Sequence, residues 1–398
     1  MNTRTPLETP SSTVVLSVAF NEDCSCFTAG LNTGFCIFNS EPCSLRSTRD
    51  FNAGISLAQM MGNANYVGLV GGGKRPKFAT NKLVLWDELK SKAILEISAL
   101  TPVRGVQLST HLIAIVLQNS VRIYKVTKPP TLSSAYETAN NPWGLCCLGQ
   151  KKIAFPGRTP GHVQLVELAT GNVSIIPAHS SPVKALQLSP DGELLSTASE
   201  TGTLIRVFST SNCARLIELR RGIDQASIFS LAFSPSGTML ACTSDKSTLH
   251  IFDVPHPRRP SPQMLQQQQN GGSSQIFSPQ NGSSAADKSD DGKGKWGILS
   301  KIPMMPRMFS DVYSFASAPF EVDDEETPAV VTGLPMSEST TLGTSKPPKG
   351  VIGWLNESTL IVVGAGTNAR WEKFAIHEGS DGRRFCVREG WKRYLPSH

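Results

Sequence analysis

Two adjacent arginines, Arg220 and Arg221, are candidates for binding an anion. They lie in the segment ELRRGID, from Glu218 to Asp224, between two stretches of alternating apolar and polar residues. A guanidinium group can donate two parallel hydrogen bonds to a phosphate, and consecutive side chains of an extended strand point to opposite sides. The pair could therefore serve two pockets, one on each side of the strand. The alternative is a pair of surface arginines bonded to carboxylates.

The segments on both sides of this pair contain similar side chains. Before it come AHSSPVK and SETGTLIR, and after it come SIFS and SDKSTLH. Both sets hold a histidine, several hydroxyl groups and a cation, which together can cradle phosphates. Basic and acidic residues balance from His179 to Phe252, so local geometry rather than bulk charge would create such a site.

Other kinds of chemistry find weaker support in the sequence. GLVGGGKR, from Gly68 to Arg75, falls short of a P-loop because Arg75 replaces the Ser or Thr that would hold magnesium, and Pro76 follows. No spacing typical of a zinc site or of a nucleophile elbow is present. His179 precedes two serines but lacks a recognisable third catalytic group. The sequence therefore predicts no enzyme, no metal and no cofactor.

A repeated strand pattern must position the candidate residues. AFNEDCSCFTAGLNTGFCIF, LQLSPDGELLSTASETGTLIRVF and LAFSPSGTMLACTSDKSTLHIF share alternating apolar residues and turns rich in Gly, Pro, Asp and Ser. The third strands end at Phe38, Trp86, Tyr124, Val166, Phe208, Phe252 and Phe374. Five of the spacings lie between 38 and 48 residues, close to the period of a four-stranded propeller blade. We therefore predict an all-β fold, a seven-bladed β-propeller, rather than an ordinary β-sandwich.

The remaining spacing, 122 residues, indicates one long insertion. Residues 255–295 are rich in Gln, Gly, Ser, Pro and Asn, which cannot bury a core. We predict blades one to six (part) in residues 1–254, a disordered and membrane-inserting loop in 255–308, and the end of blade six with blade seven in 309–398. VYSFASA is expected to form the outer strand of blade six, and the acidic EVDDEETP is expected to be exposed.

Apolar residues gather near the end of the predicted loop. They are Trp296, Ile298, Leu299, Ile302, Met304, Met305 and Met308, with Lys301 and Arg307 available for anionic headgroups. This mixture suits a bilayer interface, and Pro303 and Pro306 forbid one continuous helix. Two interpretations stay open: insertion into a membrane, which we favour, and packing against the propeller.

The composition limits the class of protein further. The chain has 398 residues, of which 39% are hydrophobic and 18% charged, enough apolar material for a sizeable core. Its net charge of +6 permits an acidic partner without naming one. No apolar run approaches the ~20 residues of a membrane-spanning helix. The N-terminal MNTRTPLETP lacks the apolar region of a secretory signal, and the odd count of nine cysteines favours reduced thiols in the cytosol.

With LRRG between the fifth and sixth repeats, the chain resembles the PROPPIN family, the polyphosphoinositide-binding propellers that include the WIPI proteins. The resemblance covers most of the chain, including GGGKRPKFATNKLVLWDE in the second repeat. It implies a non-velcroed, seven-bladed propeller with two rim sites for phosphatidylinositol 3-phosphate and the 3,5-bisphosphate. It also implies a membrane-inserting loop in blade six and a role in autophagy. Leu219 stands where Phe is usual, which is similar to an LRRG-bearing branch of the family.

Carried over by position, the resemblance implies the residues of each site. The first pocket takes His179, Ser181, Thr201, Thr203, Arg206 and Arg220, and the second takes Arg221, Ser230, Ser244, Lys246, Thr248 and His250. An autophagic lipid-transfer protein is implied as a partner on the second repeat, at Asn81, Lys82 and Asp87.

The resemblance therefore implies a cytoplasmic adaptor, peripheral on preautophagosomal, endosomal and vacuolar membranes. Two weak headgroup sites on one rigid rim would gain affinity through effective concentration. We expect a monomer in solution and no nucleic-acid partner. The alternative is a propeller that scaffolds a protein complex without binding lipid.

Overall fold

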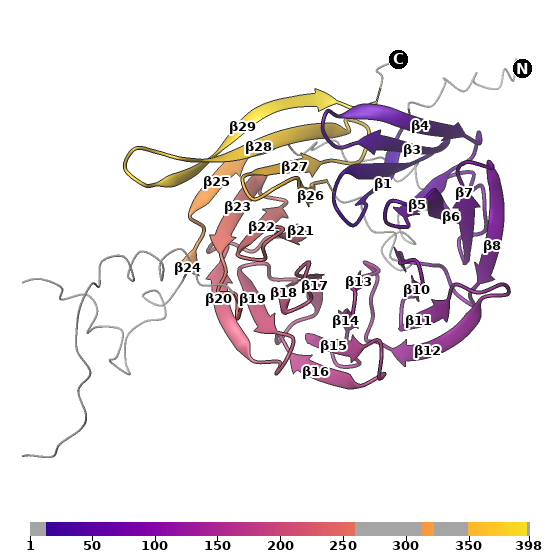
Figure 1. Ribbon diagram of the computed structural model, residues 1–398, viewed down its shortest axis with the longest axis horizontal. Coiled ribbons are helices and arrows are strands. Elements are labelled where there is room, and N and C mark those ends of the chain that lie inside the picture. Colours follow the sequence, from indigo (N-terminus) through magenta and orange to yellow (C-terminus); the bar gives the residue numbers. More distant parts are fainter. Residues whose placement is uncertain (1–12, 259–311, 322–348, 396–398) are drawn as a thin grey trace, which may run out of the picture.

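The computed structural model describes residues 13–258, 312–321 and 349–395. All regular structure within these ranges is β-strand, and Figure 1 shows the strands arranged as blades around a ring. Most of the predicted insertion, including the apolar segment 296–308, lies outside the described residues, as does the acidic stretch after Glu321. In the described ranges, no helix has the length and apolar character needed to cross a membrane.

Each blade is one sheet built on four strands that run antiparallel in chain order. Blade one has β1 (Val15–Phe20), β2 (Cys26–Leu31), β3 (Gly34–Asn39) and β4 (Ser44–Asp50), and blade two has β5 (Ile55–Met60), β6 (Tyr66–Gly71), β7 (Lys82–Asp87) and β8 (Lys92–Ser98). Blade three has β9 (Gly105–Leu108), β10 (Leu112–Val116), β11 (Ser120–Lys125) and β12 (Thr131–Glu137), and blade four has β13 (Cys147–Leu148), β14 (Lys152–Pro156), β15 (His162–Glu167) and β16 (Val173–Pro177). Blade five has β17 (Val183–Leu188), β18 (Leu194–Ser199), β19 (Leu204–Ser209) and β20 (Arg215–Arg220), joined by β24 (Val312–Tyr313). Blade six has β21 (Ile228–Phe233), β22 (Met239–Ser244), β23 (Thr248–Asp253) and β25 (Ala316–Pro319), and blade seven has β26 (Val351–Trp354), β27 (Thr359–Val363), β28 (Arg370–Glu378) and β29 (Arg384–Arg393).

These seven sheets confirm the predicted seven-bladed β-propeller. Each predicted third-strand end lies in the third strand of its blade, from Phe38 in β3 to Phe374 in β28. Blades one and seven each take all four strands from one end of the chain, so no blade is shared between the two ends. The ends are instead bridged where Val15 and Gly366 exchange backbone hydrogen bonds of 3.0 and 2.9 Å.

The chain that follows the insertion contributes to two blades rather than one. As predicted for VYSFASA, β25 is the outer strand of blade six and pairs with β23. Before that, however, β24 pairs in parallel with β20 at Leu219 and Arg220, and so extends blade five (Figure 1). The prediction of a single outer strand is therefore too simple, because this short segment joins the outer edges of blades five and six.

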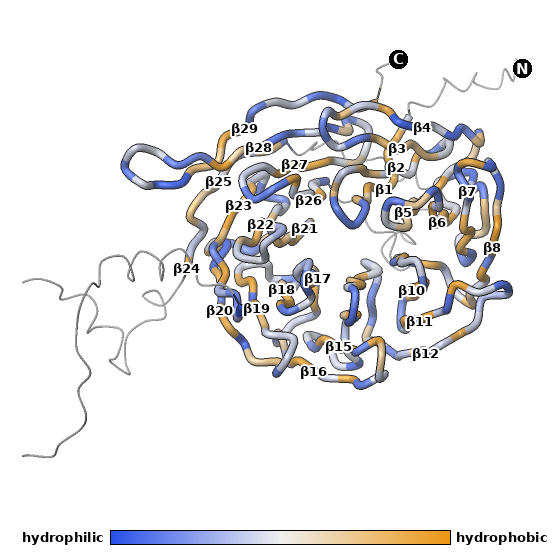
Figure 2. The backbone as a smooth tube through the Cα atoms, in the orientation of Figure 1, coloured by the Kyte–Doolittle hydropathy of each residue, from blue (hydrophilic) through white to orange (hydrophobic). Residues whose placement is uncertain are grey.

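Polar turns repeat between the strands of the blades. In blade five, Gly192 has a φ of 72° between β17 and β18, and Ser189 Oγ accepts a hydrogen bond from Leu194 N at 2.9 Å. In blade six, Ser234 and Gly237 occupy the corresponding positions, and the φ of Gly237 is 75°. Positive φ favours glycine, and serine hydroxyls stabilise such turns. Figure 2 shows the apolar stretches concentrated in the strands and a hydrophilic tip on the β28–β29 hairpin.

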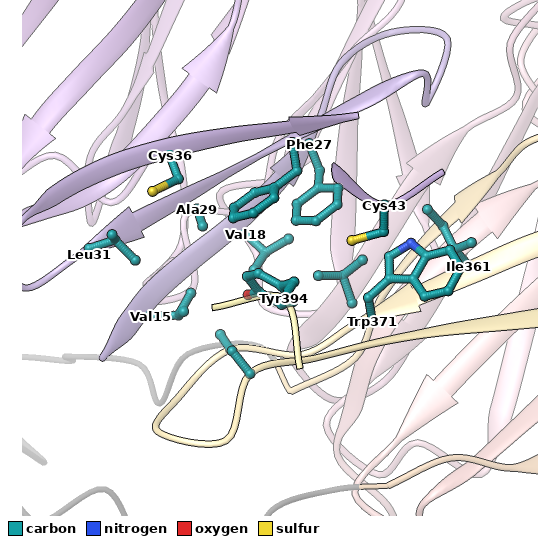
Figure 3. Close-up of a cluster of buried hydrophobic side chains, with 14 residues drawn as sticks. Val15, Val18, Phe27, Ala29, Leu31, Cys36, Cys43, Ile361, Trp371 and Tyr394 are labelled. Atoms are coloured by element: carbon teal, nitrogen blue, oxygen red, sulfur yellow. The ribbon is translucent and has the colours of Figure 1, made fainter. Parts of the chain in front are cut away.

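An aromatic cluster closes the ring between blades one and seven (Figure 3). Phe27 stacks on Phe38 with ring centroids 5.0 Å apart, and Tyr394 meets Phe27 edge-on at 5.3 Å. Trp371 of blade seven donates its indole N–H to the carbonyl oxygen of Ser40 at 3.1 Å. Because the two ends of the chain share no blade, this packing carries much of the closure.

Replacing Phe27 with Ala should destabilise the fold by about 3–5 kcal/mol, because its fully buried side chain bridges the two ends. Chemical denaturation monitored by tryptophan fluorescence would measure the loss. The matched control is Phe385→Ala, since Phe385 is 46% exposed on β29 and should cost far less. Equal losses in the two variants would show that ring closure does not depend on this cluster.

Candidate functional site

Strand pairing in blade five fixes the direction of the arginine pair. β20 pairs with β19 so that Arg220 faces Leu204, Leu219 faces Ile205 and Glu218 faces Arg206. Paired residues of an antiparallel sheet share a side, so Arg220 lies on the same side as Arg206. Leu219 points the other way and is fully buried in the core between blades five and six.

Arg221 follows β20 and lies toward blade six. Its side chain donates from Nε to the carbonyl oxygen of Gly202 at 2.9 Å and from an Nη atom to that of Asp224. The residue is only 8% exposed, so the interpretation as a surface arginine does not hold for it. The structure thus places the two arginines on opposite sides of the strand, as the alternation of side chains predicts.

Glycine is required at the turn that receives Arg221. Gly202 has a φ of 61°, in the left-handed region, and a Cβ added there would lie 1.8 Å from the carbonyl oxygen of Ala226. The backbone N–H of Arg221 donates to Thr203 O at 3.0 Å, and Ala226 N donates to Thr201 O at 3.1 Å. This close approach ties the arginine segment to the β18–β19 turn.

Around the first pocket, an arginine and a histidine share one side of blade five. Arg206 donates from Nε to Glu218 Oε2 at 2.7 Å and from an Nη atom to Ala178 O at 2.6 Å. The imidazole of His179 lies 2.9 Å from Thr197 Oγ1, and Thr197 pairs with Arg206 across the strands. Burial and the charge of Arg206 lower the pKa of His179 to about 4, so the ring is neutral at pH 7.

The remaining predicted members of the first pocket lie at the same end of the blade. Thr201 is exposed, and its hydroxyl lies 2.8 Å from Ser199 Oγ. Thr203 and Ser181 are half-buried, and Glu200 N donates to Pro182 O at 3.0 Å, next to both Ser181 and Thr201. These three hydroxyl-bearing residues thus lie in or next to the turns at the end of blade five where Arg220 lies.

The other predicted residues of the second pocket belong to blade six, on the side that faces Arg221. Ser244 is fully buried, and its Oγ accepts a hydrogen bond from Lys246 N at 3.4 Å. Lys246 is exposed in the β22–β23 turn, and Thr248 Oγ1 donates to its carbonyl oxygen at 3.0 Å. Burial and the charge of Arg221 lower the pKa of His250 to about 4, so this imidazole is neutral as well.

Ser230 does not join the second pocket. Its Oγ accepts a hydrogen bond from Ile352 N of blade seven at 3.3 Å. The register between β21 and β22 shifts between Ile228 and Ser230, so that Ile228 pairs with Ser244 but Ser230 pairs with Thr243. This bulge turns Ser230 to the opposite side of the sheet from Ser244. The prediction for Ser230 is therefore not supported, because the bulge interrupts the simple alternation.

The sequence analysis missed three residues that contact the predicted members. Thr197 bonds His179, Glu218 bonds Arg206, and Ser314 Oγ lies 3.1 Å from His250 Nδ1. The strand register could have indicated Thr197 and Glu218, since both pair with Arg206. Ser314 carries no such signal, because it lies beyond the insertion.

The predicted partner residues of blade two do not form one surface. Asn81 donates to Ala99 O at 2.8 Å, and Lys82 forms a 2.7 Å salt bridge with Glu96 at the start of β7. Asp87 lies at the other end of β7, is 4% exposed and accepts a hydrogen bond from the backbone of the following turn. The structure thus assigns Asp87 to the turn and leaves only Asn81 and Lys82 near one another.

Comparison with known proteins identifies similar sequences and folds. The PROPPIN family model matches residues 14–264. SVP1-like protein 2 of Neurospora crassa is 51% identical over 99% of both chains, and SVP1-like protein 2 of Emericella nidulans is 55% identical over 85% of this chain and 99% of its own. Hsv2 of Kluyveromyces lactis superposes with a TM-score of 0.70 at 20% identity and covers 96% of this chain and 100% of its own. A complex of KlAtg21 with the coiled coil of AgAtg16 superposes with a TM-score of 0.63 at 17% identity, covering 96% of this chain and 99% of that one.

The two neutral imidazoles predict a pH dependence of stability. Each folded-state pKa, about 4, lies below the ordinary value of 6.5, so the unfolded chain binds more protons as the pH falls between these values. Stability should therefore fall from pH 6.5 toward pH 4, and His179→Gln with His250→Gln should flatten this slope. NMR titration of the imidazole rings would test the cause directly, and titration of both rings near pH 6.5 would contradict it.

Proposed function

This chain belongs to the PROPPIN family of phosphoinositide-binding, autophagy-related propellers, and from that premise we propose that it docks edge-on to membranes bearing 3-phosphorylated phosphoinositides. The family binds lipids and acts as a scaffold rather than as an enzyme. The proposed ligands are phosphatidylinositol 3-phosphate and the 3,5-bisphosphate. The proposed locations are the cytoplasmic faces of preautophagosomal, endosomal and vacuolar membranes.

The observation that carries the proposal is the position of Arg220 and Arg221, which lie on opposite sides of one segment and next to the same turn. Arg220 pairs with Leu204 beside the β18–β19 turn, and Arg221 bonds the same turn from the other side. Lys246 lies in the β22–β23 turn, which is the corresponding turn of blade six. The two proposed pockets would therefore lie at the same end of neighbouring blades, where two headgroups of a single membrane could be bound together.

Exposed apolar side chains beside the arginines favour a membrane over a soluble phosphate compound. Ile223 is 80% exposed two residues after Arg221, and Tyr313 is 52% exposed and pairs with Arg220 through β24. Apolar and aromatic groups next to cations are typical of side chains at the bilayer interface. They support contact with lipid as well as with its headgroup.

The apolar segment 296–308 is proposed to insert into the bilayer. The segment lies outside the described residues, but β24 begins four residues after Met308 and pairs with β20 at Leu219 and Arg220. The described chain thus resumes beside the arginine pair, shortly after the proposed segment ends in the sequence. This placement supports insertion at the same rim that would bind the headgroups.

A protein partner is proposed in addition to the membrane. The structure of KlAtg21 with the coiled coil of AgAtg16 is an example of a protein of this fold in complex with another protein. For this chain we propose that an autophagic lipid-transfer protein contacts blade two near Asn81 and Lys82. We propose that the chain is a monomer until such a partner binds.

Replacing Arg220 and Arg221 together with Ala should abolish flotation with liposomes that contain phosphatidylinositol 3-phosphate. The melting temperature should fall modestly, because Arg221 is buried and closes the β18–β19 turn, but a cooperative transition should remain. The matched control is Arg158→Ala with Arg383→Ala, which removes the same charge from side chains that are 74% and 89% exposed. Unchanged flotation of the folded Arg220/Arg221 variant would leave a protein scaffold without lipid binding as the better interpretation.

Replacing Ile302, Met304 and Met305 with Asp should release the protein from the same liposomes, because charged side chains resist burial among acyl chains. Affinity for the soluble headgroup, measured by calorimetry, and the melting temperature should not change. The control is deletion of residues 263–284, which should alter neither property. If the Asp variant unfolds or still floats with liposomes, the segment packs on the propeller or plays no part in membrane binding.

A further inference from the structure

The two proposed pockets differ in what neutralises their arginines. In the first, Glu218 lies 2.7 Å from Arg206 Nε and 3.1 Å from an Nη atom of Arg215. Because Glu218 and Arg220 are two residues apart on β20, they project to the same side of the strand. A carboxylate therefore lies among the cations that would receive a phosphate.

Within the described residues, the arginine of the second pocket makes a different set of contacts. Arg221 donates to the carbonyl oxygens of Gly202 and Asp224, which are neutral acceptors. The charge of Arg221 also reaches His250, where it helps to lower the pKa of the imidazole. These partners of Arg221 are neutral backbone oxygens, whereas Arg206 bonds a carboxylate in addition to the carbonyl oxygen of Ala178.

A carboxylate and a phosphate can compete for the same N–H donors at the edge of a guanidinium group. Both accept paired N–H donors, and two anions near one cation repel each other. The side chains of Arg206 and Glu218 are 23% and 30% exposed, so solvent screens their interaction only in part. A headgroup entering the first pocket must therefore displace Glu218 from Arg206 or bind beside its negative charge.

From this asymmetry we propose that Glu218 determines the affinity and charge preference of the first pocket. It competes with the headgroup for Arg206, makes the first pocket the weaker of the two, and disfavours the more highly phosphorylated headgroup there. The pocket of Arg221 is then occupied first. This inference rests on the proposed function, because it requires that both pockets accept phosphate.

Calorimetry on the full chain with soluble headgroups tests the proposal. The probes are inositol 1,3-bisphosphate and inositol 1,3,5-trisphosphate, which correspond to the headgroups of the two proposed lipids. A background of Lys246→Ala with His250→Ala weakens the second pocket and leaves the turn bonds of Arg221 intact. In this background Glu218→Gln should tighten binding about tenfold, which corresponds to about 1.4 kcal/mol, and should favour the trisphosphate more than the bisphosphate.

An acid–arginine pair that joins blade five to the chain after β23 supplies the control. Glu193 lies in the β17–β18 turn, at the end of blade five opposite the β18–β19 turn, and its Oε1 is 3.1 Å from an Nη atom of Arg258. Glu193→Gln makes the same change in net charge and should leave headgroup affinity unchanged. Glu218→Ala, with its shorter side chain, should tighten binding as Glu218→Gln does, and melting curves should show that all variants are folded.

The possible results distinguish failure of this inference from failure of the proposed function. Tighter binding in the Glu218 variants alone supports competition. Weaker or unchanged binding would show that Glu218 positions Arg206 rather than competing with the headgroup for it. Equal tightening in the Glu193 variant would show that the effect comes from net charge alone. Either result overturns the proposal. No headgroup binding by the unmodified protein or by any variant would instead reject the proposed function itself, and this inference with it.

Discussion

The pairing of β20 with β19 is the constraint on which both candidate pockets depend. Leu219, fully buried between blades five and six, fixes this register by its side chain. A shift of one residue would exchange the two sides of β20 and move Arg220 from the side of Arg206 into the core. The turn at Gly202 then receives Arg221 on the opposite side. The burial of Leu219 thus directs Arg220 to one side of β20 and Arg221 toward blade six.

Repetition of the blade explains why the residues of the two proposed pockets lie at the same end of neighbouring blades. Blades five and six each end their second strand at a polar turn, and the arginine segment is the link between the blades. β24, where the described chain resumes after the insertion, pairs in parallel with β20 at Leu219 and Arg220, next to the arginine segment. Closure between blades one and seven lies elsewhere on the ring and rests on aromatic packing. The candidate site and the closure of the ring therefore occupy different parts of the propeller.

Periodicity in the sequence was sufficient to predict the blades, because a two-residue side-chain alternation and a constant repeat length survive without tertiary information. It also predicted the opposite directions of Arg220 and Arg221. It could not predict the bulge that turns Ser230 toward blade seven, since one extra residue reverses every later side chain. Nor could it predict β24, a strand of two residues whose pairing is decided by neighbours. Asp87 has the charge of a surface residue, but its carboxylate is buried because the following turn needs an acceptor.

The neutral state of both histidines shapes how a membrane would be recognised. Because His179 and His250 carry no charge at pH 7, they would offer hydrogen bonds to a headgroup, while the attraction for its phosphates would come from the arginines and Lys246. Glu218 would cancel part of that attraction in the first pocket, so this pocket alone would hold a headgroup weakly. A rigid rim then makes the second contact effectively intramolecular once the first has formed. Residence on a membrane would accordingly depend on how many headgroups that membrane presents within reach of both pockets, and a surface with sparse headgroups would release the protein.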